Sequence, residues 1–229
     1  MNKSPTSKAA GQSSIVIAVD GPAASGKGTI ARALAEHFGL PHMDTGALYR
    51  AVALNLWRWG GNPASEFEAV RACEDIGSNL DDPELRSEPV SKIASIISTY
   101  PAVREALLER QREFAAQDGG AVLDGRDIGT VIAPEARAKL FVTASAEVRA
   151  RRRVRELLER GMPAHFEEVL CDLKGRDARD MNRVAAPLLQ SADADLLDTS
   201  EMTKEEAIAQ AIQLVEARLA RETRASKAQ

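Results

Sequence analysis

The hydrophobic positions of this chain fall into short continuous runs separated by segments of helical period. The run "SIVIAV" over residues 14–19 is apolar throughout and rich in β-branched residues, a pattern typical of a strand covered on both faces. Comparable runs occupy residues 121–124, 139–144 and 195–199, and a weaker one occupies residues 40–46. Strands that alternate with helices predict an α/β fold, in which a mostly parallel sheet is flanked by helices and ligands bind at the C-terminal ends of the strands.

Two helices are clear from their apolar period. In the helix that follows the first strand, an apolar residue recurs every four positions: Ile30, Leu34 and Phe38. Gly39 is a suitable residue to end that helix. Near the C-terminus, Thr203 and Glu206 have the spacing of a capping box at a helix start. One apolar stripe follows them, formed by Ile208, Ile212, Val215 and Leu219.

Two segments fit the alternation poorly. Residues about 60–118 carry helical patterns without a strong strand, and residues about 149–185 are dense in arginine and aspartate. We interpret both as excursions that cover a substrate bound to the core sheet. The chain length suits a single domain, which we place at residues 14–222.

Composition narrows the class of protein. The net charge of −4 argues against a dedicated nucleic-acid binder. Cys73 and Cys171 have neither metal-ligand nor CxxC spacing, which suits a reducing cytoplasm. Residues 1–13 are polar and without an apolar segment of a signal peptide, so we expect a disordered N-terminal segment there and a flexible tail over residues 223–229. No run approaches the length of a membrane helix.

The stretch "GPAASGKGT" carries the first chemical signal. Gly21, Gly26 and Lys27 match the phosphate-binding loop pattern, in which glycines let backbone N–H groups turn toward a phosphate chain. The hydroxyl residue usual after the lysine is replaced by Gly28, so we expect Thr29 to bond a phosphate oxygen and water to complete the shell of a magnesium ion. A glycine-rich turn without a ligand is the alternative. The residues expected to contact ATP are Gly21, Pro22, Ala23, Ala24, Ser25, Gly26, Lys27, Gly28 and Thr29.

Other nucleotide-binding classes lack their signals here. The chain has no N-K-x-D motif of a GTPase and no G-x-G-x-x-G fingerprint of a dinucleotide-binding enzyme. A mechanical ATPase usually ends its second acidic strand in Asp-Glu, whereas Asp124 is followed by Gly125 and Arg126. These absences leave the kinases that use a P-loop.

Arginine is the second chemical signal. Arg176, Arg179 and Arg183 share one helix face with Asp180, and six arginines lie between residues 149 and 160. A phosphate acceptor is already anionic at neutral pH and needs no base, but it repels the donor phosphates by about 4 kcal/mol for each close pair of charges at an effective dielectric constant near 20. Guanidinium groups offset that repulsion. The pattern therefore favours transfer of a phosphoryl group to a phosphate, although solvated helix faces explain some arginines equally well, such as Arg151, Arg155 and Arg160.

Several motifs together identify a family. In chain order they are "DGPAASGKGT", "DTGALYRA", "YPAVREALLERQREF", "DGRDIGTV" and "GRDARDMNRVAAPL", over residues 19–187. They resemble the bacterial cytidylate kinases closely. The resemblance implies a P-loop core sheet with an insert that binds the nucleoside monophosphate (about 60–118) and an arginine-rich lid (about 149–170). It also implies transfer of the γ-phosphoryl group of ATP to CMP and dCMP with Mg²⁺.

The resemblance assigns roles to residues of the matching motifs. The residues it places at CMP are Thr45, Arg50, Ser95, Arg104, Arg126, Asp127, Arg176, Asp180 and Arg183. Among them Arg50 and Arg126 would hold the acceptor phosphate, and Asp127 would help to read cytosine. The catalytic set would be Lys27, Arg126, Arg176 and Arg183, and the lid set Arg149, Arg152 and Arg153.

The assignment of Asp127 also agrees with the chemistry of the base. A carboxylate accepts a hydrogen bond from the 4-amino group of cytosine and repels the carbonyl of uracil, a discrimination of about 1–3 kcal/mol. A helix N-cap after the "DGRD" turn is the alternative role for Asp127.

The remaining candidates receive structural interpretations. We expect His37, His42 and His165 to be surface, packing or turn residues, and Trp57 and Trp59 to belong to the core. No residue is assigned as a direct metal ligand, but Asp124 could contact magnesium through water or else cap a turn. Asp44 is a weaker candidate for the same role.

The segment over residues 60–90 is shorter than in many bacterial members of the family and reads as helix and loop, so a reduced insert is expected. The alternatives to a cytidylate kinase are a kinase for another monophosphate such as UMP, or a nucleotide-binding module without catalysis. In each case we expect a monomer that binds neither nucleic acid nor membrane.

Overall fold

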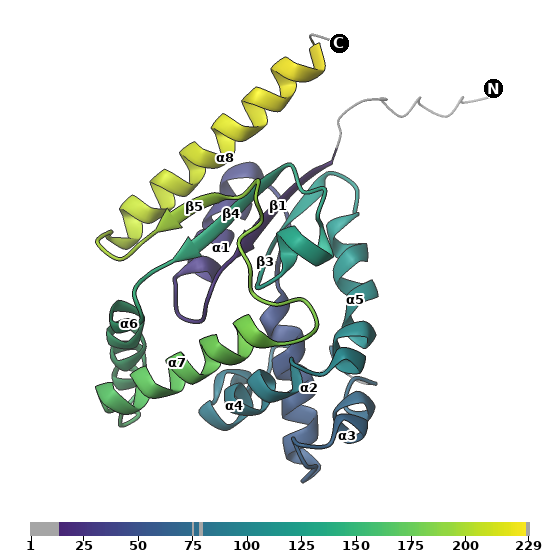
Figure 1. Ribbon diagram of the computed structural model, residues 1–229, viewed down its shortest axis with the longest axis vertical. Coiled ribbons are helices and arrows are strands. Elements are labelled where there is room, and N and C mark those ends of the chain that lie inside the picture. The colour runs from purple at the N-terminus through teal and green to yellow at the C-terminus, as the bar shows by residue number, and fades with distance from the viewer. Residues whose placement is uncertain (1–13, 75, 78–79, 228–229) are drawn as a thin grey trace, which may run out of the picture.

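The computed structural model describes residues 14–74, 76–77 and 80–227, with the side chains of 222–227 left aside. The centre of the protein is a five-stranded sheet of order β2-β3-β1-β4-β5, in which every pairing is parallel. The strands are β1 (Ile15–Asp20), β2 (His42–Asp44), β3 (Gly120–Gly125), β4 (Ala138–Thr143) and β5 (Asp195–Asp198). All five lie where the apolar runs predicted them, and the predicted α/β fold is confirmed (Figure 1).

Helices cover both faces of this sheet. The described helices are α1 (Lys27–Phe38), α2 (Thr45–Arg58), α3 (Glu66–Arg71), α4 (Glu88–Ile97), α5 (Pro101–Ala115), α6 (Ala146–Glu159), α7 (Phe166–Asn182) and α8 (Lys204–Lys227), with short turns η2 (Pro83–Arg86) and η3 (Ile128–Ile132). Leu34 of α1 and Val215 of α8 pack with Ile17 and Leu140 on one face of the sheet. On the other face, Ala115 of α5 and Ile128 of η3 pack with Leu123 of β3.

A separate apolar cluster stabilises the first of the two segments that were expected to cover the substrate, residues about 60–118. Residues of α2 pack against Val90 and Ile97 of α4 and Leu107 of α5. Within its described residues, this segment contains helices and no strand, as its pattern predicted. It lies below the sheet in Figure 1, where α2, α3 and α4 form one group.

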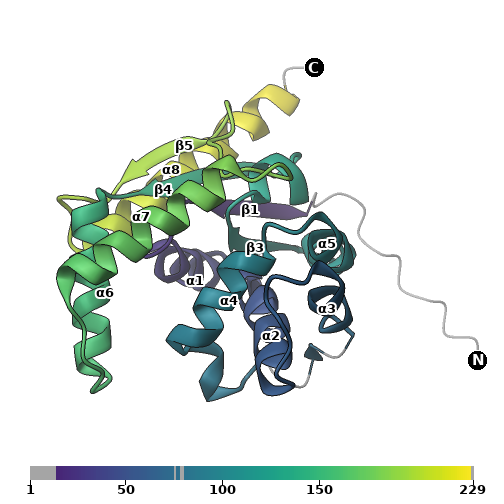
Figure 2. The same cartoon turned by 60° about the horizontal axis from the view of Figure 1, so that its bottom comes forward.

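The arginine-rich segment forms a pair of helices. α6 and α7 pack against each other and are joined by a turn that contains Gly161 in the left-handed region, φ 72°. Both views place α7 across the open end of the sheet, next to α4 (Figures 1 and 2). The two covering segments therefore face each other over the C-terminal ends of the strands.

The structure corrects two expectations about the elements. The flexible tail expected over residues 223–229 is helical as far as Lys227, because the run of Arg, Glu, Ala and Lys favours continuation of α8. The disordered segment expected over residues 1–13 lies outside the described residues. The second correction concerns Trp57 and Trp59, which are 41% and 45% exposed because Leu54 and Leu56 occupy the buried face of α2.

The helix ends follow the predicted signals. Gly39 adopts φ 64° and ends α1. Thr203 and Glu206 form the capping box of α8, since the Glu206 backbone N–H donates to Thr203 Oγ1 and the Thr203 N–H donates to Glu206 Oε2. None of the described helices has the length and apolar content that a bilayer crossing requires.

Candidate active site

The P-loop lies between β1 and α1, as its motif predicted. Gly26 adopts φ 93° directly before the first turn of α1, a conformation that favours glycine. Gly21 approaches the neighbouring strand so closely that a β-carbon there would lie 2.0 Å from the Val142 carbonyl oxygen. Backbone N–H groups of the loop and the positive end of α1 thus face the same space, which suits an anion.

Lys27 is the charged group of this loop. Its Nζ donates a hydrogen bond to the Pro22 carbonyl at 3.2 Å, and its side chain is buried. Burial, followed by repulsion from Arg126, lowers the pKa of Lys27 to about 7. A cation under this penalty is stabilised by an arriving anion, so the electrostatics of the loop also favour a phosphate chain.

Asp127 lies at the centre of a buried cluster of charges. Arg183 Nη2 donates to its Oδ1 at 3.0 Å, and Arg104 Nη2 donates to its Oδ2. All three residues are less than 10% exposed. Asp127 does occupy the N-cap position of η3, but its side chain makes no capping bond there. Arginine instead occupies both of its oxygens.

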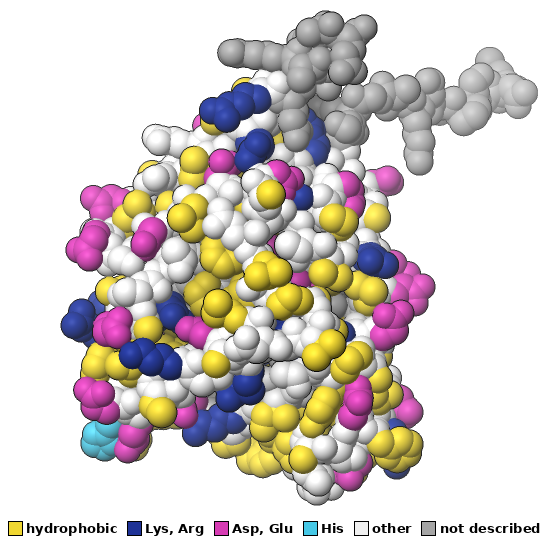
Figure 3. All heavy atoms as spheres, in the orientation of Figure 1, with side chains coloured by type: hydrophobic (Ala, Val, Ile, Leu, Met, Phe, Trp, Pro, Cys, Tyr) yellow, Lys and Arg dark blue, Asp and Glu magenta, His cyan; other side chains and the backbone are white. Residues whose placement is uncertain are grey.

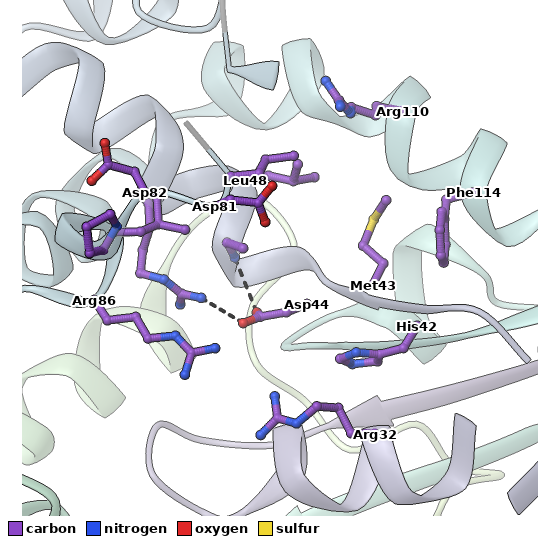
Figure 4. A pocket seen from close by; sticks show the side chains of 15 residues that line it. Arg32, His42, Met43, Asp44, Leu48, Asp81, Asp82, Arg86, Arg110 and Phe114 are labelled. Carbon is purple, nitrogen blue, oxygen red and sulfur yellow. Dashed lines mark hydrogen bonds and ion pairs between the residues drawn. The ribbon is translucent and has the colours of Figure 1, made fainter. Parts of the chain in front are cut away.

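A second group of arginines borders the cleft. Arg126 Nε donates to Asp180 Oδ2 at 2.8 Å. Arg50 Nη2 donates to Asp44 Oδ2 at 2.7 Å, and Figure 4 shows Asp44 with this bond as a dashed line. The buried Nε atoms of Arg50 and Arg176 have no hydrogen-bond partner within the described residues. Burial, followed by repulsion from Arg126, lowers the pKa of Arg176 to about 10. Donors in this state suit phosphate oxygens.

A cleft of about 760 Å³ connects these groups. The P-loop, the start of α2, the C-terminal end of β3, α4 and α7 form its walls. All nine residues assigned to CMP line it, as do Ala23, Ala24, Gly26, Lys27, Gly28 and Thr29 of the P-loop. Gly21, Pro22 and Ser25 do not line this cleft. The motifs therefore brought together, from five separate stretches of sequence, residues that form one concave surface.

Two assigned residues have hydrogen bonds that the sequence did not suggest. Thr45 Oγ1 donates to the Asp124 carbonyl at 2.8 Å, so this hydroxyl joins α2 to β3. Ser95 Oγ accepts from Arg179 Nε at 3.1 Å, which links α4 to α7 across the cleft.

The three lid arginines separate into two groups. Arg149 is buried, where it makes two bonds to the Asp177 carboxylate and donates to the Ala23 carbonyl. Arg152 donates to the hydroxyl and carbonyl oxygens of Thr199. Neither lines the cleft. Of the three, only Arg153 lines it.

Contacts join the two covering segments. Arg153 of α6 pairs with Glu88 at the start of α4, and Lys92 Nζ lies 3.3 Å from Asp172 Oδ2 of α7. Where α7 passes α4, Figure 3 shows basic side chains beside acidic ones, without a broad basic patch on the described part of this face. The positive charge of the site is thus concentrated inside the cleft.

Sequence analysis assigned no role in this region to Asp20 or His42, and it gave Asp44 only as a weaker candidate for contact with magnesium. The Asp20 carboxylate accepts from the N–H groups of Ile128 and Gly129, both at 2.8 Å, and ties β1 to the turn after Asp127. Burial raises the pKa of Asp20 to about 6. His42, expected to be a surface or packing residue, donates from Nε2 to Asp124 Oδ1 at 2.8 Å. Asp44 pairs with Arg50 and caps α2. For His42, the signal available was its place in β2, two residues before Asp44 and on the same face of the strand.

The donor set fits a magnesium ion held through water. A β-carbon placed on Gly28 would lie 3.6 Å from Asp124 Oδ2, so this carboxylate faces the P-loop position where a hydroxyl ligand is absent. No group of three or more His, Cys, Asp or Glu residues within the described residues is arranged to hold a metal. A carboxylate facing the phosphates suits Mg²⁺, which keeps several of its waters.

The P-loop and the arginine-lined cleft at the edge of a parallel sheet define a P-loop phosphotransferase fold. A gluconokinase from Sinorhizobium meliloti shares the fold with a TM-score of 0.54 and 16% identity, over 93% of this chain and 97% of that one. An uncharacterized protein from Eubacterium ventriosum matches with a TM-score of 0.54 and 14% identity, over 90% and 99% of the two chains. At these identities the likeness concerns the fold alone.

Sequence comparisons narrow this class to one family. The cytidylate kinase family model matches residues 17–217. A cytidylate kinase from Xanthobacter autotrophicus is 55% identical over 208 residues, which cover 90% of this chain and 99% of the relative. One from a Methylobacterium species is 58% identical over 181 residues, 79% and 86% of the two chains. The chain belongs to the cytidylate kinase family, as its motifs predicted.

Proposed function

We propose that the protein transfers the γ-phosphoryl group of ATP to CMP and dCMP, forming CDP and dCDP. The observation that carries the proposal is the combination, in one cleft, of a P-loop lysine with arginines whose buried donors have no internal partner. A nucleotide sensor without catalysis has no need for a second anion site of this kind. Membership of the cytidylate kinase family supports CMP as the acceptor.

The residues would act through charge and position. An oxygen of the CMP phosphate attacks the γ-phosphorus of ATP, the bond from this phosphorus to the β,γ-bridging oxygen breaks, and ADP leaves. Lys27 and the P-loop N–H groups hold the donor phosphates, while Arg50 and Arg126 hold the acceptor phosphate. Arg176 and Arg183 neutralise the charge that spreads over the transferring group. The acceptor oxygen is ionised at neutral pH, so no side chain is required as a base.

Magnesium would accompany ATP in this proposal. When bound, Mg²⁺ neutralises negative charge on the β- and γ-phosphate oxygens. Asp124 would accept a hydrogen bond from one of its waters, and Thr29 would bond a phosphate oxygen. We also propose that the enzyme acts as a monomer in the cytoplasm. The fact that every residue assigned to CMP lies on one cleft of a single chain supports the monomer.

The test is release of ADP from ATP with CMP, dCMP, UMP, AMP or GMP as acceptor. We expect CMP and dCMP to be phosphorylated far faster than the other three. Fastest turnover with UMP would indicate a kinase for a different pyrimidine nucleotide. ATP binding without ADP release for any acceptor would indicate a non-catalytic module.

A further inference from the structure

The carboxylate of Asp124 is positioned by a single neighbour. Asp124 lies at the C-terminal end of β3 and is 4% exposed. His42 Nε2 donates to its Oδ1 at 2.8 Å, and this is the only hydrogen bond that the Asp124 carboxylate makes within the part of the chain that the structure describes. The other oxygen, Oδ2, lies closer to the open position beside Gly28.

The register of the parallel strands explains why His42 reaches this carboxylate. Asp44 of β2 is paired with Asp124 of β3, and His42 is paired with Val122. Residues two apart in a strand share one face, so His42 and Asp124 are diagonal neighbours on the same face of the sheet. Figure 4 shows the His42 ring on β2 beside Asp44, on the side of the pocket where Arg32 of α1 lies.

The hydrogen bond between His42 and Asp124 matters because Lys27 lies nearby. Asp124 and Asp44 both act electrostatically on Lys27, whose Nζ is bonded to a carbonyl and not to a carboxylate. Without a donor at position 42, rotation of the Asp124 side chain toward Lys27 would satisfy this buried carboxylate. Such a pair would remove Asp124 from the magnesium waters and partly neutralise the lysine needed for the phosphates.

We propose that His42 is a positioning residue, which holds Asp124 Oδ1 so that Oδ2 faces the hydrated magnesium of bound ATP. The inference rests on the proposed function for the presence of Mg²⁺ and ATP. It assigns to His42 a role in the donor half of the site, so the binding of CMP is left unchanged.

The variants follow from the geometry. His42→Leu removes the donor at similar size, whereas His42→Gln retains an N–H donor that can reach the carboxylate. His37→Leu is the matched control, because His37 Nε2 makes a similar contact of 2.9 Å with Glu216 on the exposed side of α1. Asp124→Asn completes a double-mutant cycle with His42→Leu.

The measurement is calorimetric titration of ATP into each protein without CMP, once with Mg²⁺ and once with EDTA. The dissociation constant of ATP with EDTA, divided by that with Mg²⁺, gives the coupling between Mg²⁺ and ATP. We expect His42→Leu to lower this ratio about tenfold, as for residues that orient a ligand. His42→Gln retains most of it, His37→Leu keeps the wild-type ratio, and His42→Leu has no further effect in the Asp124→Asn background.

Two results would overturn the proposal. One is a wild-type coupling ratio in His42→Leu, even if its melting temperature falls, since this would make the contact merely structural. The other is a loss of about tenfold or more in His42→Gln, which retains the donor. This second result does not need the leucine variant, so it decides alone if that variant does not fold. Failure of the wild-type protein to phosphorylate CMP would refute the proposed function separately, because the coupling ratio is measured without CMP.

Discussion

At the scale of single residues, Arg176 combines a cost to stability with a role in the proposed chemistry. Its buried Nε has no hydrogen-bond partner within the described residues, and burial followed by Arg126 lowers its pKa to about 10. Removal of a cation in this state relieves repulsion without breaking an ion pair. Arg176 is therefore suited to stabilise bound polyanions and does not stabilise the empty protein.

Arg176→Met tests this opposition directly. We expect turnover with CMP to fall at least about a hundredfold, because a donor to the transferring group is lost. The melting temperature of the nucleotide-free protein should stay the same or rise. Steady-state kinetics and thermal denaturation of the same preparation measure both. Arg155→Met, at an exposed position of α6, is the control that should change neither, and full activity of Arg176→Met would contradict the assignment.

Asp127 is the residue to which we assign discrimination between bases. Asp127→Asn replaces an acceptor by a group that can donate to the uracil carbonyl, so the preference for CMP over UMP should narrow about tenfold or more. The measurement is the ratio of kcat/KM for CMP to kcat/KM for UMP in each variant. A loss of activity that arises because Arg104 and Arg183 lose their partner affects both substrates and cancels in this ratio. Asp118→Asn, at an exposed site, is the control. An unchanged ratio would assign the reading of the base to another residue.

At the scale of elements, the pair formed by Arg149 and Asp177 joins α6 to α7. Arg149 also donates to the carbonyls of Ala23 and Ala144, so one guanidinium connects this helix pair to the P-loop and β4. The family resemblance placed Arg149 in the lid, because a sequence motif does not separate an arginine in a buried ion pair from one that faces a ligand. The element is thus anchored at the start of α6, whereas Arg153, one turn further on, faces the cleft.

Arg149→Met should therefore act mainly on stability. Breaking a buried ion pair leaves the Asp177 carboxylate without its cation, and we expect a loss of about 3 kcal/mol in the free energy of unfolding. Denaturant titration measures this, with Arg155→Met again as the comparison. A variant with wild-type stability but greatly reduced turnover would instead support the role in the lid that the family resemblance gave to Arg149.

At the scale of the whole molecule, nucleotide binding should be coupled to protons through Lys27. In the empty protein its pKa is lowered to about 7, chiefly by burial, so it is largely neutral above that pH. A bound polyphosphate favours the charged form. ATP binding at pH 8.5 should therefore take up about one proton, and ATP affinity should fall as the pH rises above 7.

Calorimetry in two buffers of different ionisation enthalpy measures the proton uptake. Lys27→Met removes the titrating group, so its ATP binding, although weaker, should show no uptake from this source. Equal uptake by the two proteins would assign the proton to another group.

Sequence reasoning reached the sheet, the P-loop and the acceptor cluster because each depends on local pattern or contiguous motifs. The apolar runs predict the strands, and the contiguous motif that contains Asp127 predicts that Arg126 and Asp127 belong to the same site. It did not reach the contact between His42 and Asp124, which depends on the register of two strands 82 positions apart. It also placed Trp57 and Trp59 in the core, because the last turn of an apolar helix does not by itself show which residues its neighbours cover.

The pairing of Arg153 with Glu88 has a consequence for the order of events in turnover. It joins the two segments that cover the cleft, so we expect displacement of one of them to move the other. Binding of the first nucleotide should therefore position residues that bind the second. We expect the two substrates to bind synergistically, each with a lower dissociation constant when the other is present.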